Sequence, residues 1–309
     1  MRLSEKIDRA LFHYSNCMTV WVILLALVAY FKPAPFVAMK PHMDLFFQIT
    51  MFGIGTLMKA DDFKRITEMP RLVLIGTVAQ FTIMPFGAYI FAHLFNLPPA
   101  LTLGLILTGA APEAMASNVI AYVAKADLLY AVSLTTVSTL LAPILTPGLT
   151  LLLAHESFHI DFWAMFFSLV SIIIVPLGIG FFLRHFSGKL LDPILRFFPA
   201  LSTTFIVFIC ALVVALNKGN LSKLTLIVII ACVCLNVNGM LMGYGVGKLF
   251  KMNVSRCRTL SIEVGMQNAG LGTLIALKYF APETAIPAAL FVVLCLTTAS
   301  IAAQFWQRH

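Results

Sequence analysis

The sequence predicts an all-α membrane protein with ten transmembrane helices. Sixty per cent of the 309 residues are hydrophobic and only 11% are charged, whereas about a quarter of the residues of a soluble domain are charged. The mean hydropathy is +0.95. The net charge of +8 comes from basic residues scattered between apolar runs. We therefore expect the lipid bilayer, and no nucleic acid, as the partner of this surface.

Ten apolar segments follow one another along the chain, most of them near the roughly 20 residues that span a bilayer. Charged residues, prolines and glycines separate the segments. Their approximate bounds are 17–31, 42–58, 70–95, 99–123, 127–154, 162–184, 194–216, 222–250, 254–279 and 282–306. The first two segments are short for spanning helices.

The positions of the Lys and Arg residues agree with ten membrane spans, because most of them fall on one side of the membrane. Cytoplasmic loops collect Lys and Arg, and with the N-terminus inside, 16 of the 21 basic residues fall on the cytoplasmic side. A missed span would destroy this segregation. We therefore expect a multi-pass protein of the plasma membrane, the inner membrane in a bacterium, with both termini in the cytoplasm.

Ten spans divide into two halves of five, 1–154 and 155–309. Because five is odd, a second half related to the first would lie inverted in the bilayer, which is a common plan of transporters. The support for this relation is positional, since no direct similarity between the halves is evident. In the eighth segment Gly239, Gly243 and Gly247 recur at every fourth residue, which predicts close packing against another helix.

Two acidic residues lie in the middle of apolar segments. Glu113 stands midway along the fourth segment and Glu263 midway along the ninth, whereas the other 11 of the 13 acidic residues lie near segment ends or in loops. A carboxylate at the centre of a bilayer costs about 2.5–3.5 kcal/mol on insertion scales. Pro112 beside Glu113, and Gly265, Gly270 and Gly272 after Glu263, weaken a helix. Both segments are therefore expected to break in mid-membrane.

Neither segment offers a basic side chain at the depth of its glutamate, so a cation, a proton or neighbouring polar side chains must compensate the charge. Glu263 and Gln267 share a helix face, and the carbonyl groups from Val264 to Met266 lie between them. Carboxylate, amide and carbonyl oxygens suit a hard cation such as sodium. A simpler interpretation stays open, in which Pro112 only kinks a helix and both glutamates are protonated packing residues.

The motifs around the two glutamates resemble those of the bile acid:sodium symporter family. Glu263-Val-Gly-Met-Gln267-Asn268 resembles the family signature Glu-x-Gly-x-Gln-Asn, and Pro112 with Ser117-Asn118 resembles the pattern Pro-Gly-Gly-x-x-Ser-Asn. The resemblance implies a core domain of spans three to five and eight to ten, in which the broken helices four and nine cross. It also implies a panel domain of spans one, two, six and seven.

The resemblance also implies functional residues. The expected sodium ligands are, in a first site, Ser117, Asn118, Thr135 and Glu263, and, in a second, Gln80, Glu263, Gln267 and the backbone oxygens of Val264 and Met266. The expected substrate-binding residues, beside the crossing point, are Glu113, Ala114, Met115, Asn268, Thr297 and Thr298.

Two positions depart from the family pattern. Ala131 stands where a second hydroxyl of the first sodium site is expected, and Glu113 with Ala114 replaces the paired glycines. Glu113 puts a negative charge where an anionic substrate should meet a positive helix end. Three outcomes follow: Glu113 is protonated, it binds a cation or proton of its own, or the substrate is not a simple anion.

These features predict a sodium-coupled secondary active transporter, a symporter of an organic anion such as a bile acid or a smaller carboxylate, working by alternating access as a monomer. Sodium, two ions by the resemblance, is the coupling ion and no other cofactor is expected. No Walker A motif is present, so ATP does not drive transport.

Other functions remain as alternatives. A proton-coupled carrier of an organic solute would use the same glutamates, and a passive channel would need neither ion. An intramembrane hydrolase would need a paired-Asp motif, a GxSxG motif or metal-ligand spacing, and the chain has none of these. We therefore expect a transporter that is not an enzyme and has no catalytic residues.

Overall fold

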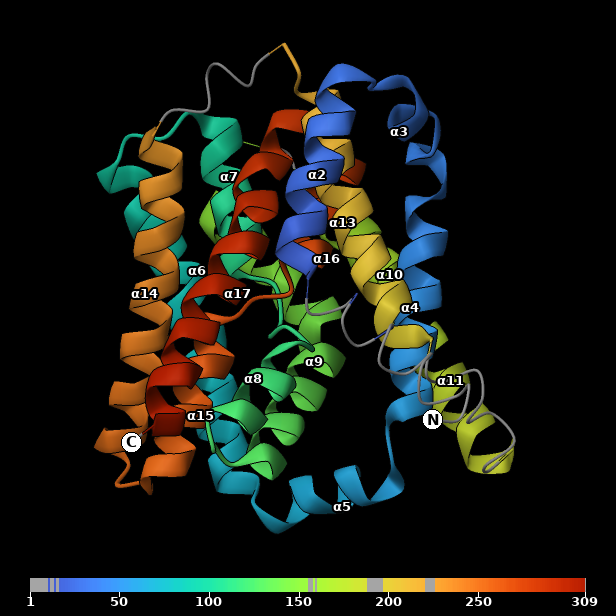
Figure 1. Ribbon diagram of the computed structural model, residues 1–309. Coiled ribbons are helices and arrows are strands. Elements are labelled where there is room, and N and C mark those ends of the chain that lie inside the picture. The colour runs from blue at the N-terminus through green and yellow to red at the C-terminus, as the bar shows by residue number, and fades with distance from the viewer. Residues whose placement is uncertain are drawn as a thin grey trace. The chain divides into compact units, whose positions relative to one another are not determined.

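The computed structural model describes residues 11, 14, 17–154, 158, 160–187, 197–219 and 226–308. Within these residues every regular element is a helix (Figure 1). Two residues form one isolated β-bridge. The predicted segments 194–216 and 222–250 begin outside the described residues, and the predicted cytoplasmic residues 1–10 also lie outside them.

Six helical stretches of the described chain are long and apolar enough to cross a membrane. They are α6 (Pro70–Leu94), α9 (Leu128–Ala154), the run of α10 (Phe162–Leu169), a π-helical turn (Val170–Ile174) and α11 (Val175–Ser187), α13 (Phe198–Leu216), α14 (Leu226–Leu249), and the run of η5 (Pro282–Ala285) and α17 (Ile286–Arg308). The prediction of an all-helical membrane protein is confirmed. The number of ten spans stays a prediction.

The remaining helices are shorter. They are α2 (Met18–Phe31), α3 (Ala34–Ala38), η1 (Lys40–His42), α4 (Met43–Leu57), α5 (Ala60–Glu68), α7 (Pro99–Gly109), α8 (Ser117–Val123), α15 (Val254–Gly265) and α16 (Ala269–Tyr279). Among them, α2 and α7 are apolar. Each of the predicted segments 99–123 and 254–279 therefore contains two short helices.

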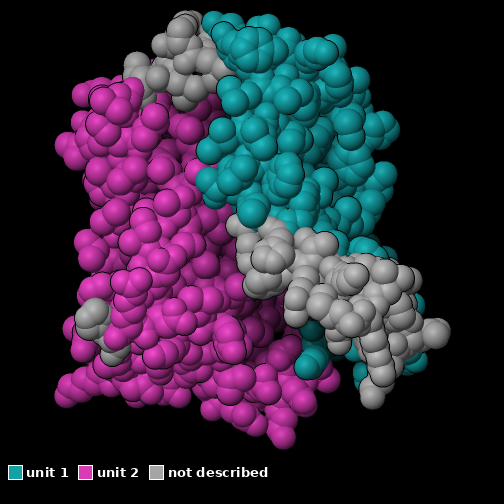
Figure 2. Space-filling view, viewed as in Figure 1, with its two compact units in different colours: residues 1–59, 168–221 teal, residues 60–167, 222–309 magenta. Residues whose placement is uncertain are grey.

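The chain forms two compact units, and each unit consists of two separate stretches of sequence (Figure 2). The first unit contains Met1–Lys59 and Ser168–Leu221, and the second contains Ala60–Phe167 and Ser222–His309. Every residue expected to bind sodium or substrate belongs to the second unit.

In the first unit the backbones of α4 and α11 touch at glycines. A Cβ atom added at Gly55 would overlap the carbonyl group of Leu177, and one added at Gly180 would overlap the carbonyl group of Phe52. Small residues let two helices approach closely, which increases van der Waals contact where the lipid gives no hydrophobic driving force. These two glycines therefore hold α4 against α11.

Two glycines of α11 offer a matched test of this packing. We expect Gly180→Ala to destabilise the protein by about 1–3 kcal/mol, the usual effect of an overpacked contact. A Cβ atom at Gly178 would meet nothing within 4 Å, so Gly178→Ala should be neutral or stabilise the helix by up to about 1 kcal/mol. Thermal unfolding of both variants in detergent measures the difference. Equal melting temperatures would show that α4 and α11 are not tightly packed.

In the second unit α14 packs against α15 through the predicted glycine stripe. A Cβ atom at Gly239 would meet the carbonyl oxygen of Val264 at 3.0 Å, one at Gly243 would overlap the carbonyl group of Leu260, and one at Gly247 would meet Cys257. The prediction of close helix packing at this stripe is confirmed. Because α15 carries Glu263, the stripe also fixes the position of that glutamate.

Candidate functional site

The segments that follow α7 and α15 lie side by side in the second unit. Glu113 and Gln267 form an isolated antiparallel β-bridge. The bridge consists of two backbone hydrogen bonds, from the Ala114 N–H to the Met266 carbonyl at 3.0 Å and from the Asn268 N–H to the Pro112 carbonyl at 2.8 Å. Backbone groups that the ends of α7 and α15 leave unpaired thus pair with each other.

Side chains satisfy further carbonyl groups at the end of α7. The Thr146 hydroxyl donates to the Ala110 carbonyl at 2.8 Å, and the Gln80 amide donates to the Ala111 carbonyl at 3.1 Å. Pro112, which has no N–H, follows directly, so the helical hydrogen-bond pattern cannot continue there. Thr146 was not among the residues predicted to have a role. Its only sequence signal is a hydroxyl next to a proline inside an apolar run.

The end of α15 and the start of α16 are stabilised in the same way. The Asn236 amide donates to the Gly265 carbonyl at 2.8 Å, and the Asn268 side chain accepts from the Leu271 N–H at 3.2 Å as an N-cap. Gly270 and Gly272, expected to help break this segment, lie inside α16 instead. That expectation was wrong because the cap at Asn268 starts a helix that tolerates both glycines.

Glu263 lies at the centre of a buried polar cluster. The Ser117 hydroxyl donates to its Oε2 atom at 2.9 Å, and the Thr135 hydroxyl lies 3.0 Å from the same atom. The Asn118 amide lies 3.4 Å from the Thr135 hydroxyl. The second carboxylate oxygen of Glu263 and the side-chain oxygen of Asn118 are buried and have no hydrogen-bond donor among the described residues. Two oxygens of this cluster are therefore available to a ligand.

Gln80 and Gln267 form a reciprocal amide pair beside this cluster. The Gln80 amide donates to the side-chain oxygen of Gln267 at 2.7 Å, and the Gln267 amide donates back at 3.2 Å. The Gln267 amide also donates to the Val264 carbonyl at 2.9 Å. The Met266 carbonyl already accepts the bridge hydrogen bond. Three of the groups expected in the second sodium site, namely the Gln80 and Gln267 side chains and the Val264 carbonyl, thus lie in one hydrogen-bonded cluster.

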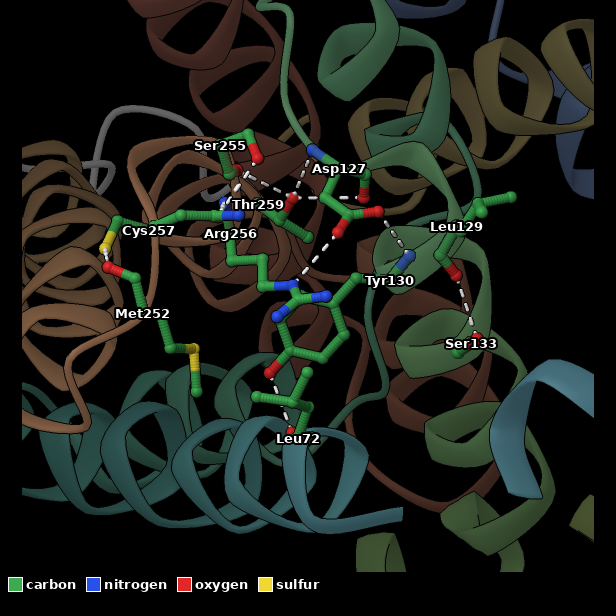
Figure 3. A network of polar contacts seen from close by, with 11 residues as sticks. Leu72, Asp127, Leu129, Tyr130, Ser133, Met252, Ser255, Arg256, Cys257 and Thr259 are labelled. Carbon is green, nitrogen blue, oxygen red and sulfur yellow. Dashed lines mark hydrogen bonds and ion pairs between the residues drawn. The ribbon is translucent and has the colours of Figure 1, made fainter. Parts of the chain in front are cut away.

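A polar network connects the start of α9 with the first turns of α15 (Figure 3). The Arg256 side chain pairs with the Asp127 carboxylate at 3.1 Å, and the Thr259 hydroxyl lies 3.1 Å from the Asp127 carbonyl. The Asp127 carboxylate also caps α9 by accepting from the Tyr130 N–H at 3.2 Å. The Asp127 N–H donates to the Ser255 carbonyl at 3.3 Å.

This network sets the register of α9 against α15. Thr135 lies eight residues after Asp127, and Glu263 lies eight residues after Ser255. Eight residues of an α-helix rise about 12 Å, so two helices joined at their starts bring these two side chains to the same depth. The hydrogen bond between Thr135 and Glu263 follows from that register.

The residues expected to bind substrate have different environments. Ala114 and Met115 are partly buried, and Thr297 is exposed. The Thr297 hydroxyl donates to the Val293 carbonyl of its own helix. The Thr298 hydroxyl lies 2.5 Å from the side-chain oxygen of Asn236. These residues therefore form no single hydrogen-bonded cluster, and Asn236 is a neighbour that the expected set did not contain.

Glu113 is fully buried, with an exposed fraction of 0%. Neither of its carboxylate oxygens accepts a hydrogen bond from a described residue. The structure thus leaves this charge without compensation by the residues that it describes.

Comparison with known proteins identifies the family. A sequence profile described as the Sodium Bile acid symporter family matches residues 45–224. This chain belongs to that family. The matched residues include parts of both compact units. Because the chain belongs to this family and has several helices that can cross a membrane, it is an integral, multi-pass membrane transport protein.

Relatives extend the similarity over nearly the whole chain. A Bacillus subtilis (strain 168) protein named "Uncharacterized sodium-dependent transporter YocS" is 35% identical over 303 residues, 98% of this chain and 94% of that protein. Two plant proteins, each named "Probable sodium/metabolite cotransporter BASS1, chloroplastic", are 31% identical to this chain. The Arabidopsis thaliana protein matches 95% of this chain and 74% of its own length, and the Oryza sativa subsp. japonica protein 93% and 71%. The predicted class of sodium-dependent transporter is confirmed at this level.

Proposed function

We propose that this member of the sodium bile acid symporter family couples sodium entry to uptake of a small organic anion, a bile acid or a smaller carboxylate, by alternating access. The geometry of Glu263 is the observation that carries the proposal. Its buried carboxylate has two hydroxyl neighbours on one oxygen and none on the other. A bound cation compensates the charge of a buried carboxylate that has no basic partner and is not protonated.

The proposed architecture has ten spans in two inverted halves, 1–154 and 155–309. In it, α7 with α8 and α15 with α16 are the two broken helices, numbers four and nine. Two observations support this assignment. The helices α7 and α15 end within the predicted segments, and Glu113 and Gln267 form a β-bridge just beyond these two ends. The composition of the two compact units supports a panel domain of spans one, two, six and seven and a core domain of the other six.

The proposed first sodium site uses oxygens of Ser117, Asn118, Thr135 and Glu263. Its support is the convergence of these four side chains and the two buried oxygens that lack donors. A hydroxyl that now donates to a carboxylate can rotate and present its lone pairs to a cation. Ala131 adds no side-chain oxygen, so this site depends on the other four residues.

The proposed second sodium site uses Gln80, Gln267, Glu263 and the carbonyl groups of Val264 and Met266. The amide pair at 2.7 Å and 3.2 Å supports it, because two side-chain oxygens and a backbone carbonyl already lie within one hydrogen-bonded cluster. Sodium binding would require the two amides to turn their oxygens toward the ion. Both proposed sites share Glu263, so they would fill cooperatively.

The substrate is proposed to bind where α8 and α16 begin. Ala114 and Met115 are only partly buried and Thr297 is exposed, so a solute can reach them, and Asn268 and Thr298 offer polar groups nearby. Sodium at Glu263 would neutralise the carboxylate and hold the broken helices in the arrangement that binds the solute. Sodium and solute should then increase each other's affinity by the same factor.

The proposed setting is a monomer in the plasma membrane, the inner membrane in a bacterium, with both termini in the cytoplasm. The predominance of basic residues on one side of the predicted spans supports this orientation. Sodium is the only ion that the proposal requires.

A screen and an uptake assay test the proposed function. We expect some organic acids to raise the melting temperature of the purified protein more in sodium chloride than in choline chloride. In proteoliposomes, uptake of such an acid should saturate and should require an inward sodium gradient. Uptake driven by a pH gradient without sodium would indicate proton coupling, and uptake that does not saturate would indicate a channel. Either result would contradict the proposal.

A further inference from the structure

Glu113 and two buried threonine hydroxyls are polar groups that the two proposed sodium sites do not use. We propose that Glu113, with the hydroxyl groups of Thr77 and Thr139, forms a third site, for a monovalent cation, separate from both sites at Glu263. This inference rests on the proposed function, because it assumes that cations enter the core of the second unit.

The backbone on both sides of Glu113 is fixed. The Pro112 carbonyl before it and the Ala114 N–H after it form the two hydrogen bonds of the bridge, at 2.8 Å and 3.0 Å. The carboxylate of Glu113 is nevertheless fully buried without a hydrogen-bond donor among the described residues. A fixed, buried carboxylate that lacks donors has both oxygens available to coordinate a cation.

Thr139 faces the segment that contains Glu113. In α9, Thr146 donates to the carbonyl group at the start of segment 110–118, and Thr135 contacts the amide at the end of that segment. Thr139 lies four residues after Thr135 and seven before Thr146, so all three hydroxyls share one helix face. Glu113 lies within the same segment, opposite this face.

The Thr139 hydroxyl is unusual for a helical threonine. Buried threonines in helices commonly donate to the carbonyl group four residues earlier, and Thr150 of α9 does so at 2.7 Å. Thr139 is buried, and its hydroxyl has no hydrogen-bond partner among the described residues. Its oxygen is therefore available to a ligand.

Thr77 offers a second available hydroxyl from α6. It is buried, and its hydroxyl also lacks a partner among the described residues. Thr77 lies one helical turn before Gln80, whose amide donates to the Ala111 carbonyl two residues before Glu113. Both threonines therefore belong to the helix faces that border segment 110–118. In the proposed site their hydroxyls and the carboxylate would supply the oxygen ligands that a hard cation prefers.

The charges of the proposed cycle also leave a place for a third cation if Glu113 is ionised. Two sodium ions at Glu263 carry two positive charges, which the Glu263 carboxylate and the carboxylate of an anionic solute balance. An ionised Glu113 adds one further negative charge to the same unit. Uncompensated charge is costly inside a protein, and one more monovalent cation at Glu113 makes the loaded site neutral.

Counting bound sodium tests the inference without a known solute. Radioactive sodium is titrated against the purified full chain in detergent, with choline chloride keeping the ionic strength constant. We expect three ions per chain for the wild type and two for Glu113→Gln. Glu113→Asp keeps the charge and should keep three ions at lower affinity. Three ions in the wild type and two in Glu113→Gln would together support the third site.

The threonines supply the matched variants. Thr139→Val should lower the affinity for the third ion by about tenfold, as expected for the loss of one neutral oxygen ligand. Thr150→Val removes a buried hydroxyl of the same helix that is bonded within the helix, and it should leave all three affinities unchanged. Equal effects of both substitutions would overturn the assignment of Thr139.

Each negative result identifies what fails. Two ions in both the wild type and Glu113→Gln would overturn the third site and leave the proposed function intact, since Glu113 would then be neutral in its resting form. If both proteins bind two sodium ions and Glu113→Gln has lost uptake, Glu113 binds the solute, and the third site is again overturned. No bound sodium in the wild type would contradict the proposed function itself. If Glu113→Gln does not fold, a wild-type count of two still overturns the inference.

Discussion

Glu263→Gln is expected to abolish sodium-dependent uptake. Glutamine has the size of glutamate, and the Ser117 and Thr135 hydroxyls can still donate to its amide oxygen, so the fold should persist. The variant removes the negative charge that both proposed sodium sites share. Removing one partner of a buried charge pair costs about 3–5 kcal/mol, so sodium affinity should fall by roughly 10²- to 10³-fold or more. Melting temperatures over a sodium titration and uptake in proteoliposomes measure the loss.

An exposed glutamate provides the matched control. Glu68 ends α5, belongs to the same unit as Glu263 and is exposed. Glu68→Gln makes the same chemical change outside the buried cluster and should leave sodium dependence unaltered. Uptake by Glu263→Gln with the sodium dependence of the wild type would show that the cluster around Glu263 is not the coupling site.

The sequence predicted the membrane class of the chain and the neighbours of Glu263 for different reasons. The class follows from composition, because a bilayer requires long apolar helices whatever their order. The proximity of Ser117, Thr135 and Glu263 depends on contacts between residues up to 146 positions apart. No periodicity predicts such contacts, and the expectation came from motifs that resemble one family.

The side chains that donate to the carbonyl groups at the ends of α7 and α15 were not predictable. Thr146 and Asn236 donate to the Ala110 and Gly265 carbonyls, but in the sequence each is one polar residue in an apolar run. Which carbonyl each side chain meets depends on the register between helices. Networks such as the one around Asp127 and the glycine contacts of α14 set that register. The helix ends before Pro112 and at Gly265 could be predicted because a missing N–H or a missing side chain acts locally.

Gln80→Leu and Gln267→Leu are each expected to lower sodium affinity, and their effects on stability are expected not to be additive. Each substitution removes one half of a buried amide pair and leaves the other amide without its partner, which costs about 1–3 kcal/mol. If both amides are ligands of the proposed second site, sodium affinity should also fall by roughly 10- to 100-fold in either variant. The double variant should lose less stability than the sum of the single losses, because the two residues contact each other.

Two measurements separate a sodium ligand from a purely structural amide. Stability in choline chloride reports the packing role, and the additional stabilisation by sodium chloride reports the ligand role. Asn217 is a buried amide of the other unit that donates to the Val213 carbonyl at 2.9 Å. Asn217→Leu should lower stability in choline and keep the full stabilisation by sodium. If Gln80→Leu and Gln267→Leu behave like Asn217→Leu, the amide pair only holds the helices together, and the second ion must bind elsewhere.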